Sequence, residues 1–86
     1  KVETIADGLG APFTTELPLR VVQQYVDDVV LVTDDEIAAA MRLILERTKQ
    51  MVEPAGAAAI AALLTNKAAV PHGARTIAIL SGGNVD

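Results

Sequence analysis

Residues 29–36, VVLVTDDE, decide the fold of this chain. The first four are apolar and mostly β-branched, which is typical of a strand covered on both faces. The next four match a capping box, because the Thr33 hydroxyl and the Glu36 carboxylate can each satisfy an amide that a helix N-terminus leaves unpaired. A covered strand that passes directly into a helix predicts an α/β fold.

Helices are expected on both sides of this strand. Pro18 suits a first helical turn, and the apolar spacing that follows predicts a short helix over 18–26. The helix after Thr33 is expected to run to about Lys49. Its buried face should carry one stripe of residues at helical spacing, namely Ile37, Met41, Ile44, Leu45 and Thr48.

The second half of the chain repeats the alternation of helix and strand. Glu53-Pro54 starts another helix, in which residues 55–64 are small nearly all round, so it can lie very close to a sheet or a helix. Residues 76–80 form a second buried-type strand, followed by a glycine-rich turn at 81–84. The predicted order is loop, helix, strand, helix, helix, strand.

Residues 1–86 are therefore expected to form a single, partial α/β domain with a parallel, right-handed crossover. Two strands cannot hide their own edges. More protein should cover them, either a missing N-terminal half or a second copy in a homo-oligomer.

Composition excludes several classes of function. The net charge is −4 and the basic residues are scattered, which argues against nucleic acid or an anionic membrane as partner. There is no cysteine, and His72 has no second ligand nearby. The acidic groups lack the pattern of a calcium loop, so no metal site is expected. The longest uncharged stretch is too short to span a bilayer and no signal peptide is visible, which favours the cytoplasm.

Three places could carry chemistry. Ser81 and Gly82 follow a buried strand, and ligands of open α/β sheets bind beyond the carboxyl ends of the strands, although an ordinary turn explains the pair as well. Glu53 stands at a helix N-terminus, where it is either a site carboxylate or a cap. Gly8, after Asp7, could bring backbone close to a ligand or form a plain turn.

Six short motifs follow one another along the chain: TIADG (4–8), VDDV (26–29), TDDEI (33–37), ERTK (46–49), EPAGA (53–57) and LSGGN (80–84). This succession resembles the threonine/serine dehydratase and serine racemase family of pyridoxal-phosphate (PLP) enzymes of fold-type II. The resemblance covers essentially the whole chain, and the subgroup it resembles most is threonine dehydratase (threonine ammonia-lyase).

The resemblance implies a site and a reaction. PLP would lie between two α/β domains, and the enzyme would remove the α-proton and β-hydroxyl of a small hydroxy amino acid to give ammonia and a 2-oxo acid. Ser81 would hydrogen-bond the pyridine nitrogen, and Glu53 would face the ring. Gly8 would line the pocket, Gly82 would leave room for the ring, and Asn84 would close the turn near the site.

Parts of the family pattern do not occur in these 86 residues. They are the Schiff-base lysine motif, the phosphate-binding loop and the divalent-cation ligands, and Lys1, Lys49 and Lys67 lie in other contexts. The chain is thus expected to be a fragment that is inactive alone and does not bind PLP tightly. Two alternatives stay open: a fragment of a serine racemase-like enzyme, and a non-catalytic α/β interaction module.

Overall fold

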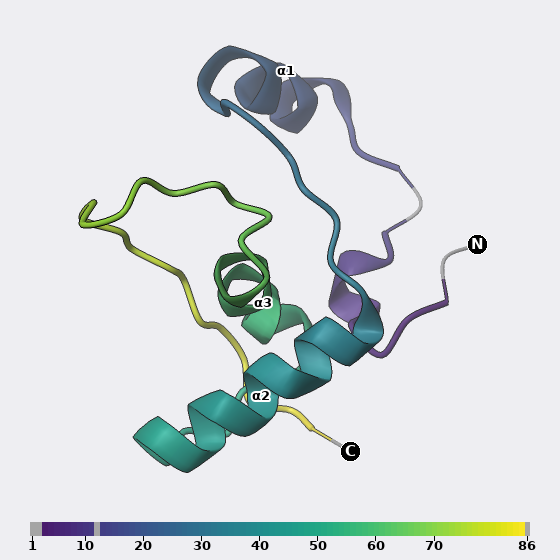
Figure 1. Ribbon diagram of the computed structural model, residues 1–86. Helices are drawn as coiled ribbons and strands as arrows, with labels where there is room; N and C mark the ends of the chain where they lie inside the picture. Colours follow the sequence, from purple (N-terminus) through teal and green to yellow (C-terminus); the bar gives the residue numbers. More distant parts are fainter. Residues whose placement is uncertain (1–2, 12, 86) are drawn as a thin grey trace.

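The computed structural model describes residues 3–11 and 13–85 as short helices joined by open chain (Figure 1). The order of helices in these residues is η1 (Asp7–Leu9), α1 (Glu16–Tyr25), α2 (Asp34–Thr48), η2 (Ala55–Ala57) and α3 (Ala58–Leu64), where η marks a 3-10 helix. Helices α2, η2 and α3 pack together, whereas α1 stands apart at the top of the view. None of the described helices has the length and apolar character needed to cross a bilayer.

Helix α2 begins and ends where the sequence predicts. The Glu36 amide donates to Thr33 Oγ1 at 3.1 Å, and the Thr33 amide donates to Glu36 Oε1 at 2.8 Å, so the capping box is complete. At the other end Lys49 takes the left-handed conformation, with φ of 60°, and its amide donates to the Leu45 carbonyl at 3.0 Å. This residue closes the last turn and stops the helix.

The buried face of α2 is narrower than expected. Ile37, Ala40 and Ile44 are buried, at the spacing of one helical stripe. Met41 is half-buried, while Leu45 is 40% exposed and Thr48 is exposed. The expected face is confirmed at its centre and wrong at its edge, because α2 is covered only along the line where η2 and α3 meet it.

The helix predicted over residues 55–64 is divided into the 3-10 helix η2 and the α-helix α3. Ala57 of η2 and Ala61 of α3 are fully buried and belong to one core with Ala40 of α2. Alanine contacts let two helices approach closely, since no long side chain stands between their backbones. The remaining buried members of this core are Ala6, Ile37, Ile44 and Val52.

The N-terminal segment is tied to the start of α2. The Thr4 hydroxyl donates to one Asp34 carboxylate oxygen, and the Ile5 amide donates to the other at 3.2 Å. The Ala6 amide in turn donates to Thr4 Oγ1 at 3.2 Å. These bonds place Ala6 in the core and hold η1, which carries Gly8, beside η2.

Helix α1 confirms the expected short helix and starts two residues earlier than predicted. Pro18 is its third residue, where the backbone amide would lack an intrahelical partner in any case. An ion pair between Arg20 and Glu16 braces the exposed surface. All described side chains of α1 are exposed, including Leu17 and Tyr25, so no other described element covers its apolar face.

The two predicted strands need correction. Within the described residues neither 29–32 nor 76–80 is assigned as strand, and both run as open chain (Figure 1). Leu31 is 84% exposed and Ile77 is 94% exposed, so the expectation that both faces are covered is wrong for this chain. A strand is defined by hydrogen bonds to a neighbouring strand. No backbone group among residues 3–11 and 13–85 forms such bonds with either segment. The predicted strand order is therefore unconfirmed, while the helices in it are present.

Part of each segment is nevertheless covered. Val30 and Val32 are half-buried and alternate with exposed neighbours, which is the side-chain pattern of a strand with one face packed. In residues 76–80 only Ala78 is half-buried. Helix α3 lies beside both segments, because its alanines line hollows with each.

Candidate functional site

The turn after residues 76–80 lies against the chain that leads into η2. The Glu53 amide donates to the Gly82 carbonyl at 3.1 Å, which joins the two segments directly. Three predicted site residues, Ser81, Gly82 and Glu53, are therefore brought together, although Glu53 lies far from the other two in the sequence.

Gly82 is required here for two physical reasons. Its φ of +73° lies in the left-handed region, which other residues enter only at a cost. A Cβ at this position would also overlap the Glu53 carboxylate and lie 3.0 Å from Glu53 Cγ. The Glu53 side chain thus packs directly on the glycine backbone of the turn.

Gly56 makes a second close contact with the turn. A Cβ at Gly56 would overlap the Ser81 carbonyl oxygen and lie 2.8 Å from the carbonyl carbon. Gly56 is buried, and Val52 Cγ1 would lie only 2.9 Å from the same Cβ. The sequence reasoning did not select this glycine as a site residue, and its local signal was only the cost of about 1 kcal/mol that a glycine has relative to alanine inside a helical pattern.

The remaining two predicted residues lie at the margin of this cluster. A Cβ on Gly8 would lie 3.1 Å from Ala55 Cβ, so η1 reaches the cluster through η2. Asn84 is exposed and makes no side-chain hydrogen bond to the described part of the chain. The structure thus groups Ser81, Gly82 and Glu53, puts Gly8 nearby, and gives Asn84 no contact that fixes its side chain.

The polar atoms of this cluster are available for a ligand. Ser81 is exposed, and its hydroxyl makes no hydrogen bond within residues 3–11 and 13–85. The Glu53 carboxylate is half-buried and takes part in no ion pair with a described residue. A hydroxyl and a carboxylate beside glycine backbone can receive a flat, polar group, because no side chain blocks the approach and the hydroxyl can donate or accept.

The lysines are held elsewhere. Lys67 Nζ donates to the Leu31 carbonyl at 2.9 Å and to Glu36 Oε1 at 2.7 Å, and Lys49 Nζ donates to the Glu46 carbonyl at 3.0 Å. Neither amine contacts Ser81 or Glu53, and Lys1 lies outside the described residues. The described lysine amines therefore lie apart from the cluster of Ser81, Gly82 and Glu53.

The pKa of Glu36, which lies away from this cluster, is shifted by its neighbours. The Lys67 ammonium, which hydrogen-bonds to the Glu36 carboxylate, lowers the pKa of Glu36 below its usual value of 4.5, and the Thr33 amide adds to this effect. Both groups stabilise the charged form of the carboxylate. This arrangement links the capped end of α2 to the loop after α3, so it is a structural contact.

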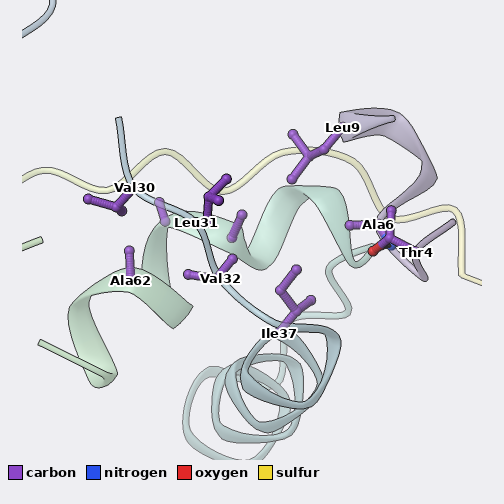
Figure 2. Close-up of a pocket in the computed structure, with 10 residues that line it drawn as sticks. Thr4, Ala6, Leu9, Val30, Leu31, Val32, Ile37 and Ala62 are labelled. Atoms are coloured by element: carbon purple, nitrogen blue, oxygen red, sulfur yellow. Dashed lines mark hydrogen bonds between the residues drawn. The ribbon is translucent and has the colours of Figure 1, made fainter. Parts of the chain in front are cut away.

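One hollow in the described part of the chain is apolar. A cavity of about 440 Å³ opens between residues 30–32, η1 and the face of α3, with Ile37 at its base (Figure 2). Among the described residues Thr4 supplies the single polar side chain of its lining, and neither Ser81 nor Glu53 borders it. A second hollow of about 260 Å³ separates α3 from residues 76–78. Such apolar surfaces suit packing against more protein.

Comparison with known proteins supplies the family. Residues 1–82 match the family described as "Pyridoxal-phosphate dependent enzyme". The chain is 43% identical over 83 residues to an L-threonine ammonia-lyase of Geobacter sulfurreducens, covering 96% of this chain and 20% of that protein. It is 42% identical over 89 residues to a serine racemase of Dictyostelium discoideum, covering 100% of this chain and 26% of that protein.

Solved structures agree with these relatives. A threonine deaminase of T.th. superposes with a TM-score of 0.83 at 35% identity, over 98% of this chain and 28% of that one. The serine racemase of Dictyostelium discoideum superposes with a TM-score of 0.76 at 38% identity, over 100% of this chain and 28% of that one. Because the family match covers nearly all of the sequence, the chain belongs to the family of pyridoxal-phosphate-dependent enzymes.

Proposed function

We propose that this chain is part of a PLP-dependent L-threonine/L-serine dehydratase and supplies the ring-nitrogen side of its cofactor site. The observation that carries the proposal is the exposed Ser81 hydroxyl, which has no hydrogen-bond partner in the described residues and stands beside Glu53 on a glycine turn. The relatives named as threonine ammonia-lyase and threonine deaminase support the reaction. The chain spans about a quarter or less of the length of the curated relatives it matches, so substrate and activity belong to the proposal.

Each residue of the cluster has a definite task in this proposal. PLP, when bound, withdraws electrons from the substrate and so eases loss of the α-proton and the β-hydroxyl. Ser81 would hydrogen-bond the pyridine nitrogen as a neutral partner, which leaves the ring a weaker electron sink than an aspartate partner would. Glu53 would face the ring, while Gly8, Gly82 and Asn84 would border it.

The fold belongs to the same proposal. Residues 29–32 already show one packed face and residues 76–78 lie beside α3, and neighbouring strands from the rest of the enzyme would supply their hydrogen-bond partners. The 86 residues would then be the C-terminal portion of a fold-type II catalytic domain. Alone they would be inactive and would not retain PLP, since Lys49 and Lys67 are bound elsewhere.

A serine racemase is the second candidate. The racemase of Dictyostelium discoideum matches the whole chain at nearly the same identity as the ammonia-lyase, so this segment does not separate the two reactions. Product analysis of the full-length enzyme with L-serine distinguishes them. D-serine as the main product would select the racemase, whereas pyruvate and ammonia would select the dehydratase.

Substitution of Ser81 in the full-length enzyme tests the proposal. Ser81→Ala should retain most of the PLP and lose one hydrogen bond in a largely dry site, worth about 1–3 kcal/mol. That loss corresponds to an elimination rate lower by about 5- to 150-fold if the bond tightens in the transition state. Ser81→Asp should instead favour a protonated ring and shift products toward racemisation or transamination. Unchanged rates and product ratios in both variants would show that Ser81 is only a turn residue.

A further inference from the structure

The chain that precedes η2 and the turn that follows residues 76–80 touch at successive positions. A Cβ on Gly83 would lie 3.2 Å from the Met51 carbonyl oxygen, the Glu53 amide donates to the Gly82 carbonyl at 3.1 Å, and Gly56 meets the Ser81 carbonyl. As the numbers rise along one segment, they fall along the other. Residues 51–56 and 81–83 therefore lie side by side and run in opposite directions.

The contact of Gly56 with Ser81 is the least adaptable of the three. The atoms that a Cβ on Gly56 would overlap are the carbonyl oxygen and carbon of Ser81, which are backbone atoms and cannot rotate away as a side chain can. The Cα hydrogen of Gly56 stands where the Cβ would be and points at this oxygen, as in a Cα–H···O contact. Val52 Cγ1 would also lie 2.9 Å from the same Cβ, so an added methyl group meets a second neighbour there.

We propose that Gly56 is a positioning residue, whose missing side chain lets the Ser81 peptide settle on η2 and so sets where the Ser81 hydroxyl meets the cofactor ring. The inference rests on the proposed function of Ser81. The Ser81 carbonyl belongs to the peptide that enters Gly82, whose left-handed φ of +73° fixes the direction of the turn. A methyl group inserted at position 56 must push this peptide outward, and the Ser81 hydroxyl moves with it.

The expected effect is large for so small a change. A displacement of about 1 Å at a reacting centre can lower a rate by on the order of 100-fold. Gly56→Ala should therefore reproduce the defect of Ser81→Ala although it leaves the hydroxyl in place. A purely structural glycine would lower stability without changing the state of the ring nitrogen.

The experiment is a double-mutant cycle in the full-length enzyme with ¹⁵N-labelled PLP. Wild type, Gly56→Ala, Ser81→Ala and the double variant are compared by the ¹⁵N chemical shift of the pyridine nitrogen, by PLP content and by elimination rate. Gly56→Ala should move the chemical shift in the same direction as Ser81→Ala and lower the rate by about 10- to 100-fold. The double variant should be no worse than Ser81→Ala alone, because both changes remove the same hydrogen bond. Gly73→Ala is a control away from the cluster: a Cβ there meets no atom within 4 Å, so the variant carries only the strain of its φ of +82° and should leave the chemical shift unchanged.

Three results would overturn the inference and leave the proposed role of Ser81 intact. One is a wild-type chemical shift in Gly56→Ala, and another is a double variant in which the two losses multiply. If Gly56→Ala does not fold, a crystal structure of the wild-type holoenzyme decides, and a Gly56 Cα more than about 4 Å from the Ser81 carbonyl oxygen removes the contact. A Ser81→Ala variant with an unchanged chemical shift refutes the proposed role of Ser81 itself, and the role of Gly56 falls with it.

Discussion

Gly82 and Gly73 share a left-handed backbone but differ in their surroundings. Their φ values are +73° and +82°, so any other residue is strained at both positions. A Cβ on Gly73 would point into open space, whereas a Cβ on Gly82 would overlap the Glu53 carboxylate. Comparing the two glycines therefore separates the cost of backbone strain from the cost of losing the contact with Glu53.

Gly73→Ala should cost about 1–2 kcal/mol of folding stability through strain alone. Gly82→Ala should cost the same strain plus a smaller amount for turning the Glu53 side chain aside, because the overlapping atoms are the end of a flexible side chain. Urea denaturation of the 86-residue chain measures both. Adding Glu53→Ala should remove the excess cost of Gly82→Ala and leave the cost of Gly73→Ala unchanged. An excess cost of Gly82→Ala that persists without the Glu53 side chain would contradict this contact.

Glu36 gives the chain a defined response to acid. Its pKa is below 4.5 in the folded chain because Lys67 and the Thr33 amide favour the carboxylate, so its contribution is present above the unfolded pKa. The contribution is lost as the pH falls through the folded pKa. Glu36→Gln should be less stable than wild type at about pH 7, and the difference should shrink toward about pH 3. Unfolding titrations at both pH values check this, and a constant difference would contradict it.

Sequence reasoning could select only residues that stand at the end of an element. Ser81, Gly82 and Glu53 could be selected because a turn after a strand and a residue before a helical proline are recognisable in the sequence alone. Gly56 was missed because its partner is the Ser81 backbone, far away in the sequence, and no local pattern points to that contact. The grouping of these residues needed the fold.

At the level of elements, the helix boundaries were the most predictable feature. Thr33 and Glu36 lie three residues apart, so the capping box depends only on local geometry and appears in the structure as predicted. Helix α1 has no such cap, because the Thr15 side chain makes no capping hydrogen bond. The two N-termini form a natural pair for measuring what a cap contributes.

Thr33→Ala should destabilise the chain by about 0.5–2 kcal/mol, since the Glu36 amide loses its acceptor at the start of α2. Thr15→Ala should change the stability far less, because there is no side-chain bond to lose and α1 packs on no other described element. Thermal or urea unfolding followed by circular dichroism compares them. Similar losses in the two variants would indicate that helix propensity, and not the cap, determines the stability of α2.

The strands could not be judged from the sequence, because a strand depends on a neighbour that the sequence does not identify. Residues 29–32 and 76–80 carry the right residue types, and α3 lies beside each. Their outward side chains are exposed and no described segment pairs with them. The residue pattern thus indicates which side chains each segment could bury. The backbone hydrogen bonds of a strand also need a neighbouring strand, which no described segment supplies.

At the scale of the whole molecule, large apolar side chains remain uncovered. They lie on α1 and on the outward faces of residues 29–32 and 76–80, and they include Leu17, Tyr25, Val29, Leu31, Ile77 and Ile79. Exposed apolar surface next to unpaired backbone favours association with another chain. The chain corresponds to 28% of the related threonine deaminase, a proportion consistent with a domain that other parts of a protein cover.

The isolated 86 residues should therefore form dimers or larger species. Replacing Leu31 and Ile77 by lysine should shift the population toward monomer, because charges on unpaired segments oppose edge-to-edge association. Gln23→Lys adds a charge on exposed α1 without removing an apolar side chain, and it should leave the association unchanged. Size-exclusion chromatography with light scattering gives the masses. A wild-type monomer with a cooperative melt would contradict the idea that these faces need a partner.

A crystal structure of the full-length enzyme with PLP bound tests most directly whether the Ser81 hydroxyl hydrogen-bonds the pyridine nitrogen of the cofactor. The distance between Ser81 Oγ and the pyridine nitrogen should fall at about 2.6–3.2 Å, in the plane of the ring. Glu53 should face the same ring, and Gly56 should touch the Ser81 carbonyl as it does here. A ring nitrogen bound by another side chain, with Ser81 Oγ more than about 4 Å away, would contradict the account.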